Sequence, residues 1–598
     1  MAVDGGTVTG AAAFAVVPYY TFAPMRRPDR FVFLNAGLAV SILVFAWPQL
    51  SAIAHGASNW YPLVNVVFTL LVIAIVVAWP KGDEASAQGR ATLTPAAVVA
   101  TLVAGAVVAL ALYRWMAMLM WRPYEADMLI VLREATRRLL NGRTPYATYR
   151  SYDAPWDMVM PYGPVLWGPF LAAQWLRLDL RFVTIIGELF VPVWCGVAAI
   201  VEAARGRIAG AASWLAVLAA LVLAFDVQSF TAIGHTPAYW PLLPLFAVMV
   251  GRQRWTAAAC LLGLLVVART TMVAVIPLFL MTVWDRDRRQ FLAALIVLPA
   301  VVVAAFVPFV VWDYRAMWDN MVLSYPRIIE QAVWPVLARP GLETIGVTEW
   351  LLEHHRASLV VPAQAVAMVA VYAAAWPAIR RGATALPWMA LALFAFSMTS
   401  LYPVHYLYYD VLLLLVSCAL AGALERGPAR MTALPWLASV GALIAVTFVA
   451  ERVMMSTFPH AASDEASRGD MLRGGFAMNE RDGRRQFSWI VGREATIVLP
   501  RSSSASADIV VAAQSPFDAD RPPQRVTAIL NGTLLGEAPM PAGVQEIRFG
   551  APRSTWWVGF NQLQLLFAST VSPRDVGAGD DPRPLALAFS RVDVTPKK

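Results

Sequence analysis

Two carboxylates one residue apart, Glu125 and Asp127, follow a long apolar run that ends near Met120. A run of that length predicts a helix that crosses a membrane, so both acids are expected at the membrane surface, where the head group of a lipid-linked substrate passes. A positioned carboxylate can take the proton of an acceptor hydroxyl and so make the oxygen more nucleophilic. Acids also stabilise the N-terminus of a helix by charge. Base catalysis and helix capping are therefore the two interpretations of this pair.

The residues after this pair predict a helix that lies flat on the membrane surface. Its apolar side chains recur at helical spacing, at Met128, Leu132, Ala135 and Leu139. Its other faces carry arginines, among them Arg133 and Arg137. These two are candidates for binding a lipid phosphate, and the alternative is that they reach the head groups of bulk lipid. Asn141-Gly142 is expected to end the helix.

The composition is that of an integral membrane protein. Of the 598 residues, 59% are hydrophobic and 14% are charged, with a mean hydropathy of +0.58, which is too apolar for a soluble chain of this length. The three cysteines lie inside apolar runs and indicate neither disulfides nor a thiolate metal site. The net charge of +8 comes from short arginine clusters between apolar runs, a pattern typical of membrane orientation. We therefore expect a lipid bilayer as a partner and no nucleic acid.

The apolar runs predict an all-α bundle of about thirteen membrane spans over residues 31–450, after a cytoplasmic N-terminal segment, residues 1–30. The approximate spans are 31–50, 61–79, 95–120, 182–203, 209–226, 238–251, 255–268, 271–284, 291–312, 357–379, 384–401, 410–424 and 431–450. The basic clusters fall on the cytoplasmic side only if the run 161–176 does not cross, and the arginines of the loop that contains this run are then the one exception. This run is therefore predicted to be a second surface helix within a large outer loop, residues 121–181.

Other polar residues are expected on the same outer side. His235 lies in a short outer turn, and His405 and Tyr406 lie in a later one. Arg269 falls at the outer end of a hairpin of short apolar helices, where a cation is costly unless an anion pairs with it. That anion could be a lipid phosphate or a carboxylate such as Glu188, about two turns into its own span.

The composition changes after residue 450. Residues 451–485 are predicted to be a linker, and residues 486–598 show the period of two expected for strands with one buried face. Asn531-Gly532 is a tight hairpin signal. We expect a β-sandwich outside the cell, because the last predicted span ends there. Its tryptophans could stack on sugars or form its core: Trp489, Trp556 and Trp557.

The membrane part resembles the GT-C superfamily of polyprenyl-phosphate-sugar-dependent glycosyltransferases, most closely glycosyltransferase family 87. The shared motifs are an acidic residue early in the outer loop, a Gly-x-x-Pro-Tyr turn and a Tyr-Pro-rich juxtamembrane helix, here Asp127, Gly142 to Tyr146, and Pro161-Tyr162-Gly163-Pro164. The layout covers roughly residues 95–450. The terminal domain is similar to jelly-roll, carbohydrate-binding-like modules attached to some of these enzymes.

The resemblance implies that Asp127 is the general base, that Glu125 helps it and that His405 is a further catalytic partner. It also implies that the motif tyrosines, Tyr146 and Tyr162, bind substrate. Where family members commonly have Gly-Gln, this chain has Gly234-His235, which leaves the role of His235 open.

The function implied by the resemblance is an inverting transfer of a sugar from a polyprenyl-phosphate donor to a glycan or glycolipid acceptor, at the outer face of a bacterial inner membrane. Inversion fits one base without a second carboxylate nucleophile. No cofactor is expected, and no metal either, because the sequence shows no second acidic cluster to complete a cation shell. Two alternatives stay open: a lipid-linked saccharide flippase or transporter, and a glycan polymerase or ligase.

Overall fold

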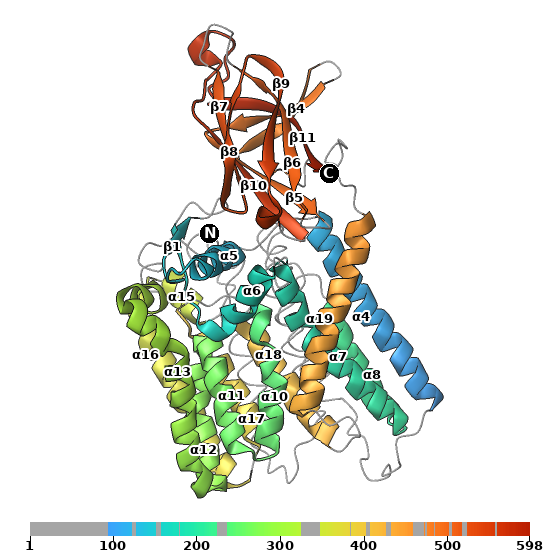
Figure 1. Cartoon of the computed structure of the whole chain (residues 1–598). Coiled ribbons are helices and arrows are strands. Elements are labelled where there is room, and N and C mark those ends of the chain that lie inside the picture. Colours follow the sequence, from blue (N-terminus) through green and yellow to red (C-terminus); the bar gives the residue numbers. More distant parts are fainter. Residues whose placement is uncertain are drawn as a thin grey trace, which may run out of the picture.

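The computed structural model describes a helical part followed by a β-sheet part (Figure 1). The described residues are 94–597, except 122–126, 151–156, 177, 179, 224–235, 325–346, 354, 383, 402–406, 426–431, 458–471, 473–474, 483–484, 502–504, 517–522 and 557–558. The predicted segment 1–30 and the first two predicted spans, 31–50 and 61–79, lie outside them.

Each predicted span from residue 95 onward contains a helix. These helices are α4 (Pro95–Trp121), α7 (Arg181–Ala204), α8 (Ile208–Leu223), α10 (Leu242–Gly251), α11 (Trp255–Ala268), α12 (Ile276–Arg286), α13 (Arg288–Met321), α16 (Val360–Arg380), α17 (Ala385–Met398), α18 (Tyr408–Glu425) and α19 (Ala433–Thr457). Among the described residues, four segments are long and apolar enough to cross a membrane: Pro95–Tyr113, Arg181–Ala204, Arg288–Met321 and Ala357–Arg380. The remaining apolar helices are shorter, so the number of thirteen crossings stays a prediction.

The longest helix, α13, is broken at Asp313. This residue has φ −158° and ψ 85°, and its carboxylate accepts a hydrogen bond from the backbone N–H of Ala316 at 3.0 Å. Asp313 therefore caps a short second helix. The break falls where the sequence predicts the end of the span, at residue 312.

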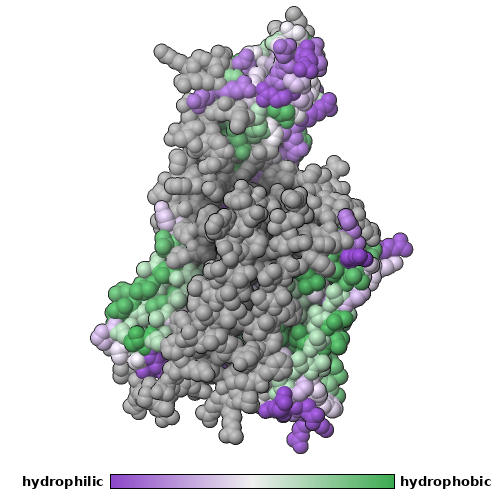
Figure 2. Space-filling model, turned by 180° about the vertical axis from the view of Figure 1, so that it is seen from behind, coloured by the Kyte–Doolittle hydropathy of each residue, from purple (hydrophilic) through white to green (hydrophobic). Residues whose placement is uncertain are grey.

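Large apolar side chains are exposed on the outside of the helical part. Examples are Leu102 on α4, Val311 on α13 and Leu434 on α19, which are 68%, 81% and 76% exposed. Figure 2 shows hydrophobic residues gathered on both sides of the helical part and hydrophilic residues on the β-sheet part. Apolar surface of this extent is stable against lipid and not against water, which agrees with a membrane protein.

Two short helices lie across one end of the bundle, next to the β-sheet part (Figure 1). They are α5 (Asp127–Leu140) and α6 (Pro164–Trp175), with the short hairpin β1 (Thr148–Arg150) and β2 (Asp157–Val159) between them. At 12 residues, α6 is about 18 Å long, but α10 and α12, which belong to predicted spans, are no longer than this. The position of α6 across the end of the bundle (Figure 1) agrees with the prediction that the run 161–176 does not cross.

The end of α5 has the hydrogen bonds of a Schellman motif. Gly142 has φ 69° and its N–H donates to the carbonyl of Leu139 at 3.0 Å. The N–H of Arg143 donates to the carbonyl of Arg138 at 2.9 Å. This pairing satisfies carbonyls that a helix end leaves without partners, and the predicted stop at Asn141-Gly142 is confirmed.

The β-sheet part is a sandwich of two sheets. Their strand orders are β5-β10-β7-β8 and β3-β4-β11-β6-β9, and the named strands pair antiparallel. The strands are β3 (Phe476–Asp482), β4 (Arg485–Val491), β5 (Glu494–Arg501), β6 (Ala507–Ser515), β7 (Gln524–Leu530), β8 (Thr533–Met540), β9 (Gly543–Ala551), β10 (Gly559–Phe567) and β11 (Leu585–Pro596). Buried residues of both sheets, such as Val511 and Leu565, share one core.

The predicted boundaries of the linker, residues 451–485, are wrong at both ends. Helix α19 continues to Thr457, and β3 begins at Phe476, so the sheets start before residue 486. Strand β3 pairs with β4 alone, and Phe476 packs edge-on against Phe589 with ring centroids 5.4 Å apart. The residues of β3, FAMNERD, show no clear period of two, which explains why the pattern missed this strand.

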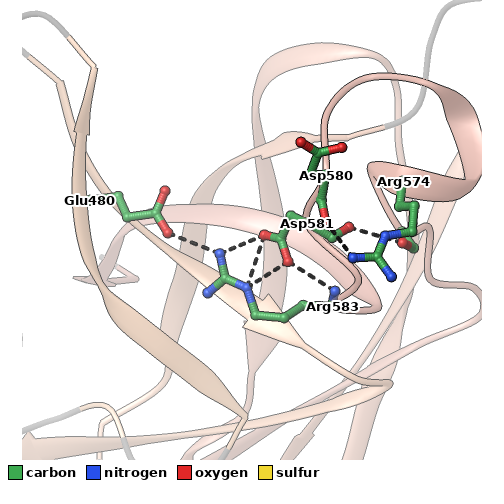
Figure 3. Close-up of polar contacts among 6 residues, drawn as sticks. Glu480, Arg574, Asp580, Asp581 and Arg583 are labelled. Carbon is green, nitrogen blue, oxygen red and sulfur yellow. Dashed lines mark hydrogen bonds and ion pairs between the residues drawn. The ribbon is translucent and has the colours of Figure 1, made fainter.

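Charged residues also tie β3 to the loop before β11. Arg583 donates to Asp581 at 2.6 Å and to Glu480 on β3 at 3.3 Å, and Arg574 donates to the backbone carbonyl of Asp580 at 3.0 Å (Figure 3). The hydrogen bonds from Arg583 hold the pKa of Asp581 below its ordinary value.

Candidate functional site

The predicted site residues differ in how far the structure describes them. Four lie outside the described residues: Glu125, His235, His405 and Tyr406. Asp127 is the first residue of α5, and only its backbone is described. The side chains that the structure does describe are those of Arg133, Arg137, Tyr146, Tyr162, Glu188 and Arg269.

Helix α5, which begins at Asp127, is covered by protein on more than one side. Leu129, Leu132 and Ala135 are fully buried in the core of the helical part. Arg133 is only 6% exposed although it is charged. The face that the sequence predicted to meet lipid head groups or phosphates contacts the β-sandwich, which lies next to α5 (Figure 1).

Both candidate arginines of α5 contact the β-sandwich. Arg133 Nη1 donates to Gln562 Oε1 on β10 at 3.3 Å. Arg137 Nη1 donates to the backbone carbonyl of Gly532 at 3.1 Å, while its other nitrogens pair with Glu134 at 2.7 and 3.0 Å. These contacts give the arginines a role in joining the two parts of the chain, and phosphate binding by them stays a prediction.

The two tyrosines of the predicted motifs hold the outer loop together. The hydroxyl of Tyr146 donates to the backbone carbonyl of Tyr162 at 3.2 Å, so the Gly142–Tyr146 turn and the start of α6 are in contact. Tyr146 also packs edge-on against Phe309 of α13 at 5.7 Å, and burial raises the pKa of its hydroxyl far above the ordinary value. Substrate binding by these tyrosines stays a prediction, since the Tyr146 hydroxyl is already used inside the loop.

Two glycines allow close approach of elements around the site. A Cβ on Gly163 would lie 2.1 Å from the carbonyl oxygen of Val267, so the start of α6 rests on the end of α11. A Cβ on Gly187 of α7 would lie 2.0 Å from the carbonyl oxygen of Pro237. The latter belongs to the 3-10 helix Thr236–Tyr239. Neither position has room for a side chain. Because Gly163 lies against Val267, the outer loop approaches the end of α11, where Arg269 follows two residues later.

Arg269 is buried where α11 ends. It is 6% exposed, and its backbone leaves the helix at φ −142° and ψ 113° before the 3-10 helix Thr270–Val275. It interacts electrostatically with Asp410 in the first turn of α18. A carboxylate partner was one of the two predicted anions. Asp410 lies within electrostatic reach of Arg269, and the identity of the anion that pairs with Arg269 stays a prediction.

Asp410 is itself held by two aromatic residues. It is 1% exposed, and the Tyr239 hydroxyl lies 2.6 Å from each of its carboxylate oxygens. Trp240 Nε1 donates to Oδ1 at 3.1 Å. We call Arg269, Tyr239, Trp240 and Asp410 the Asp410 cluster. A buried carboxylate is stable only with such partners.

Sequence reasoning missed Asp410, Tyr239 and Trp240. Asp410 is the third residue of the apolar helix α18 and follows two tyrosines, and an ionisable residue in a membrane helix is a functional candidate by default. That signal was available in the sequence. The pairing with Tyr239 was not, because 171 residues separate the two positions.

Glu188 lies beside this cluster. It is 2% exposed and lines a small cavity together with Pro192, Leu221, Trp240, Tyr409, Leu412 and Leu413. Trp240 therefore contributes both to the cavity and to the Asp410 cluster. Glu188 and Asp410 therefore both lie next to Trp240. Among the described residues, no group of three or more His, Cys, Asp or Glu side chains could hold a metal ion.

The tryptophans of the β-sandwich differ in their surroundings. Trp556 is fully buried and donates to the carbonyl of Ala551 at 3.3 Å, so it is part of the core and stacking on a sugar is excluded. Trp489 is half-buried and packs edge-on against Phe487 at 5.5 Å. Trp557 lies outside the described residues.

No protein-family model matches this chain, and no curated protein matches it at a significant level. One solved structure with partial similarity is described as a family 35 carbohydrate binding module from an environmental isolate. It covers 20% of this chain and 86% of its own length, with 14% identity and a TM-score of 0.15. A likeness this low carries no conclusion about fold or ligand.

Proposed function

We propose that this protein is an inverting glycosyltransferase of the GT-C type that moves a sugar from a polyprenyl-phosphate donor to a glycan or glycolipid acceptor at the outer face of a bacterial inner membrane. One observation supports this most. The outer loop includes α5, which begins at Asp127. Gly163 of the same loop contacts Val267, so the loop lies at the end of the bundle that holds buried Arg269. Asp127 and Arg269 therefore lie at one end of the molecule, which supports the proposal that Asp127 is the base for the acceptor and Arg269 the cation for the leaving phosphate.

The proposed reaction is a single displacement. The Asp127 carboxylate takes the proton of the acceptor hydroxyl, and the acceptor oxygen forms a bond to the anomeric carbon. The bond from that carbon to the phosphate oxygen breaks, and polyprenyl phosphate leaves as an anion. A guanidinium has five N–H donors and can bind a carboxylate and a phosphate together, so Arg269 can serve Asp410 and the donor.

One contact agrees with the predicted topology. A single count of spans and basic clusters puts the loop 121–181 and the C-terminal domain on the outer side, and the two parts are in contact through Arg133 and Gln562. The proposal therefore includes about thirteen spans, with an extracytoplasmic, jelly-roll-like sandwich. Trp489 is the described tryptophan that can still stack on a sugar, and carbohydrate binding by the sandwich belongs to the proposal as well.

A flippase or transporter of lipid-linked saccharides is the second candidate. Helices α11 and α12 are short, at 14 and 11 residues, and are joined by the 3-10 helix Thr270–Val275. Unusually short hydrophobic segments are one feature of transporters. Such a carrier would move the lipid-linked sugar across the bilayer and leave its phosphate bond intact.

The deciding experiment is an assay of the purified protein with hexosyl and pentosyl polyprenyl phosphates and a mixture of envelope glycans. Release of polyprenyl phosphate together with an elongated glycan supports the glycosyltransferase. Movement of intact donor across proteoliposomes, with no release, supports the transporter. Addition of whole glycan chains in place of single sugars would identify a polymerase or ligase.

A further inference from the structure

We propose that the β-sandwich is a fixed clamp on α5, so that Gly532 and Gln562 are positioning residues for the carboxylate at the start of that helix. This inference rests on the proposed function where it concerns turnover. It differs from the idea of a tethered carbohydrate-binding module, which would be joined to the enzyme only through its linker.

The first part of the clamp is a pair of arginines on one side of α5. Arg133 and Arg137 are four residues apart and so lie on the same face of the helix. Each donates to a different strand element of the sandwich: Arg133 to Gln562 on β10 at 3.3 Å, and Arg137 to the carbonyl of Gly532 in the β7–β8 turn at 3.1 Å. Two contacts about one turn apart restrict both the distance of α5 from the sandwich and its rotation about the helix axis.

The second part is that these two contact points form one rigid unit. Asn531 links them: its backbone N–H donates to the carbonyl of Gln562 at 2.8 Å, and its Oδ1 accepts from the N–H of Gln562 at 2.9 Å. Its Nδ2 donates to Asn561 Oδ1 and to the carbonyl of Thr555, both at 2.8 Å. Asn531 is only 7% exposed. All these hydrogen bonds lie within the sandwich, so they hold the hairpin turn on β10 without any contribution from α5.

The third part is an apolar contact beside the polar ones. Val498 on β5 is the cross-strand partner of Gln562, and both point away from the core of the sandwich. Val498 is 6% exposed and belongs to the hydrophobic core of the helical part. A stable protein interface typically has apolar contacts at its centre and polar contacts at its rim.

The fit at Gly532 offers a specific way to disturb the clamp. A Cβ there would lie 2.8 Å from Cζ and Nη1 of Arg137. Gly532 also has φ 75°, so Gly532→Ala adds backbone strain as well. Gly543 is a matched control, because it has φ 84° in the next hairpin of the same domain and nothing lies within 4 Å of its Cβ position. Gly543→Ala adds the strain without the contact.

A second pair of variants avoids backbone strain altogether. Gln562→Ala removes the acceptor for Arg133, and its control is Gln564→Ala two residues along β10, where the side chain donates to Glu494 at 2.6 Å. Gln562→Glu should rescue the contact, because a carboxylate accepts from a guanidinium more strongly than an amide does.

The experiment measures hydrogen exchange of α5 amides in the full-length protein, together with kcat and KM for the lipid donor. We expect Gly532→Ala and Gln562→Ala to speed exchange in α5 and to lower kcat by about tenfold, with KM for the donor unchanged, because a small displacement of a catalytic group costs rate more than binding. Both controls and Gln562→Glu should behave like the wild type.

Equal exchange in Gly532→Ala and Gly543→Ala, with no change in Gln562→Ala, would overturn the clamp. Faster exchange with unchanged kcat would show that the sandwich docks on α5 but positions nothing. Should the wild type transfer no sugar at all, the proposed function fails, and exchange alone then decides whether the sandwich holds α5.

Discussion

The hydroxyl of Tyr239 lies 2.6 Å from both carboxylate oxygens of Asp410, and both residues are almost fully buried. This hydrogen bond joins the 3-10 helix before α10 to the start of α18, and Asp410 in turn interacts with Arg269 at the end of α11. The Asp410 cluster thus connects three elements at the end of the bundle that carries the outer loop.

We first predict that Tyr239→Phe lowers the stability of the helical part by about 1.5–3 kcal/mol, the usual contribution of a hydrogen bond to a charged group. Tyr372→Phe is the control, because its hydroxyl donates to the neutral carbonyl of Ala274 at 2.9 Å and should cost about 1 kcal/mol. Thermal unfolding in detergent compares the two. Equal losses would contradict a charged acceptor at Tyr239.

The second prediction concerns Arg269. We expect Arg269→Ala to raise KM for the lipid donor more than KM for the acceptor, with partial rescue by Arg269→Lys, because a point charge still attracts a phosphate without a bidentate fork. Asp410→Asn should affect stability more than donor KM. If Arg269→Ala raises both KM values alike, Arg269 serves only the Asp410 cluster.

A double-mutant cycle of Arg269→Ala and Asp410→Asn separates these roles. Both residues are buried, so we expect a coupling of about 1–3 kcal/mol in stability, as for residues that share one network. The cause is that either single change leaves a buried charge without its counterpart. Additive losses would mean that the two residues do not act as a pair.

Third, Asp127→Asn should reduce transfer by about 10²- to 10⁴-fold while folding and donor binding are retained. Asn keeps a capping side chain, so loss of capping would cost about 1 kcal/mol or less. Glu125→Gln should be milder, because Glu125 is proposed as a helper. Turnover and thermal stability are measured side by side. Retention of more than about a tenth of turnover by Asp127→Asn would shift the base assignment to Glu125 or His405.

The fourth prediction tests the sidedness of the chain by cysteine labelling of intact cells. Arg143→Cys after α5 and Leu534→Cys on β8 should react with an impermeant reagent, since both positions are exposed and both are expected outside. Arg254→Cys, before α11, should react only after lysis. Native Cys195 and Cys418 are buried and Cys260 is half-buried, so the unsubstituted protein is labelled in parallel to give the background. Labelling of Arg254→Cys in intact cells would reverse the proposed topology.

The fifth prediction follows from the lowered pKa of Asp581. Because the folded-state pKa lies below the unfolded value, the Asp581 charge stabilises the sandwich above the unfolded pKa of about 3.9, and this contribution is lost as the pH falls through the lower folded value. Asp581→Asn should therefore lower the urea concentration at which half of the sandwich is unfolded near pH 7, measured by hydrogen exchange of the β11 amides. The difference from the wild type should shrink below about pH 4. Asp575→Asn, on the same loop, is the control. A difference that is constant with pH would exclude this ion pair as its cause.

Local sequence patterns were enough to predict many of the helices and turns of this protein. The apolar runs from residue 95 onward each correspond to a helix, the Asn141-Gly142 stop is a Schellman motif, and Asn531-Gly532 forms the β7–β8 turn with φ 50° and 75°. These features depend on side chains and backbone within a few residues, so period and turn chemistry are enough to predict them. The start of the sandwich at Phe476 was missed, because an edge strand shows little alternation.

The partners of the charged residues were decided by the tertiary structure. Spacing could indicate that Arg269 needs an anion, but Asp410 is brought to it only by the packing of α18, α11 and the segment with Tyr239. Likewise, the amphipathic pattern of α5 predicted a polar face, and only the folded chain covers that face with Gln562 and Gly532, 429 and 395 residues further along. A sequence shows that a buried or surface charge must be satisfied. Which distant group satisfies it depends on how separate elements pack, because such contacts have no periodicity along the chain.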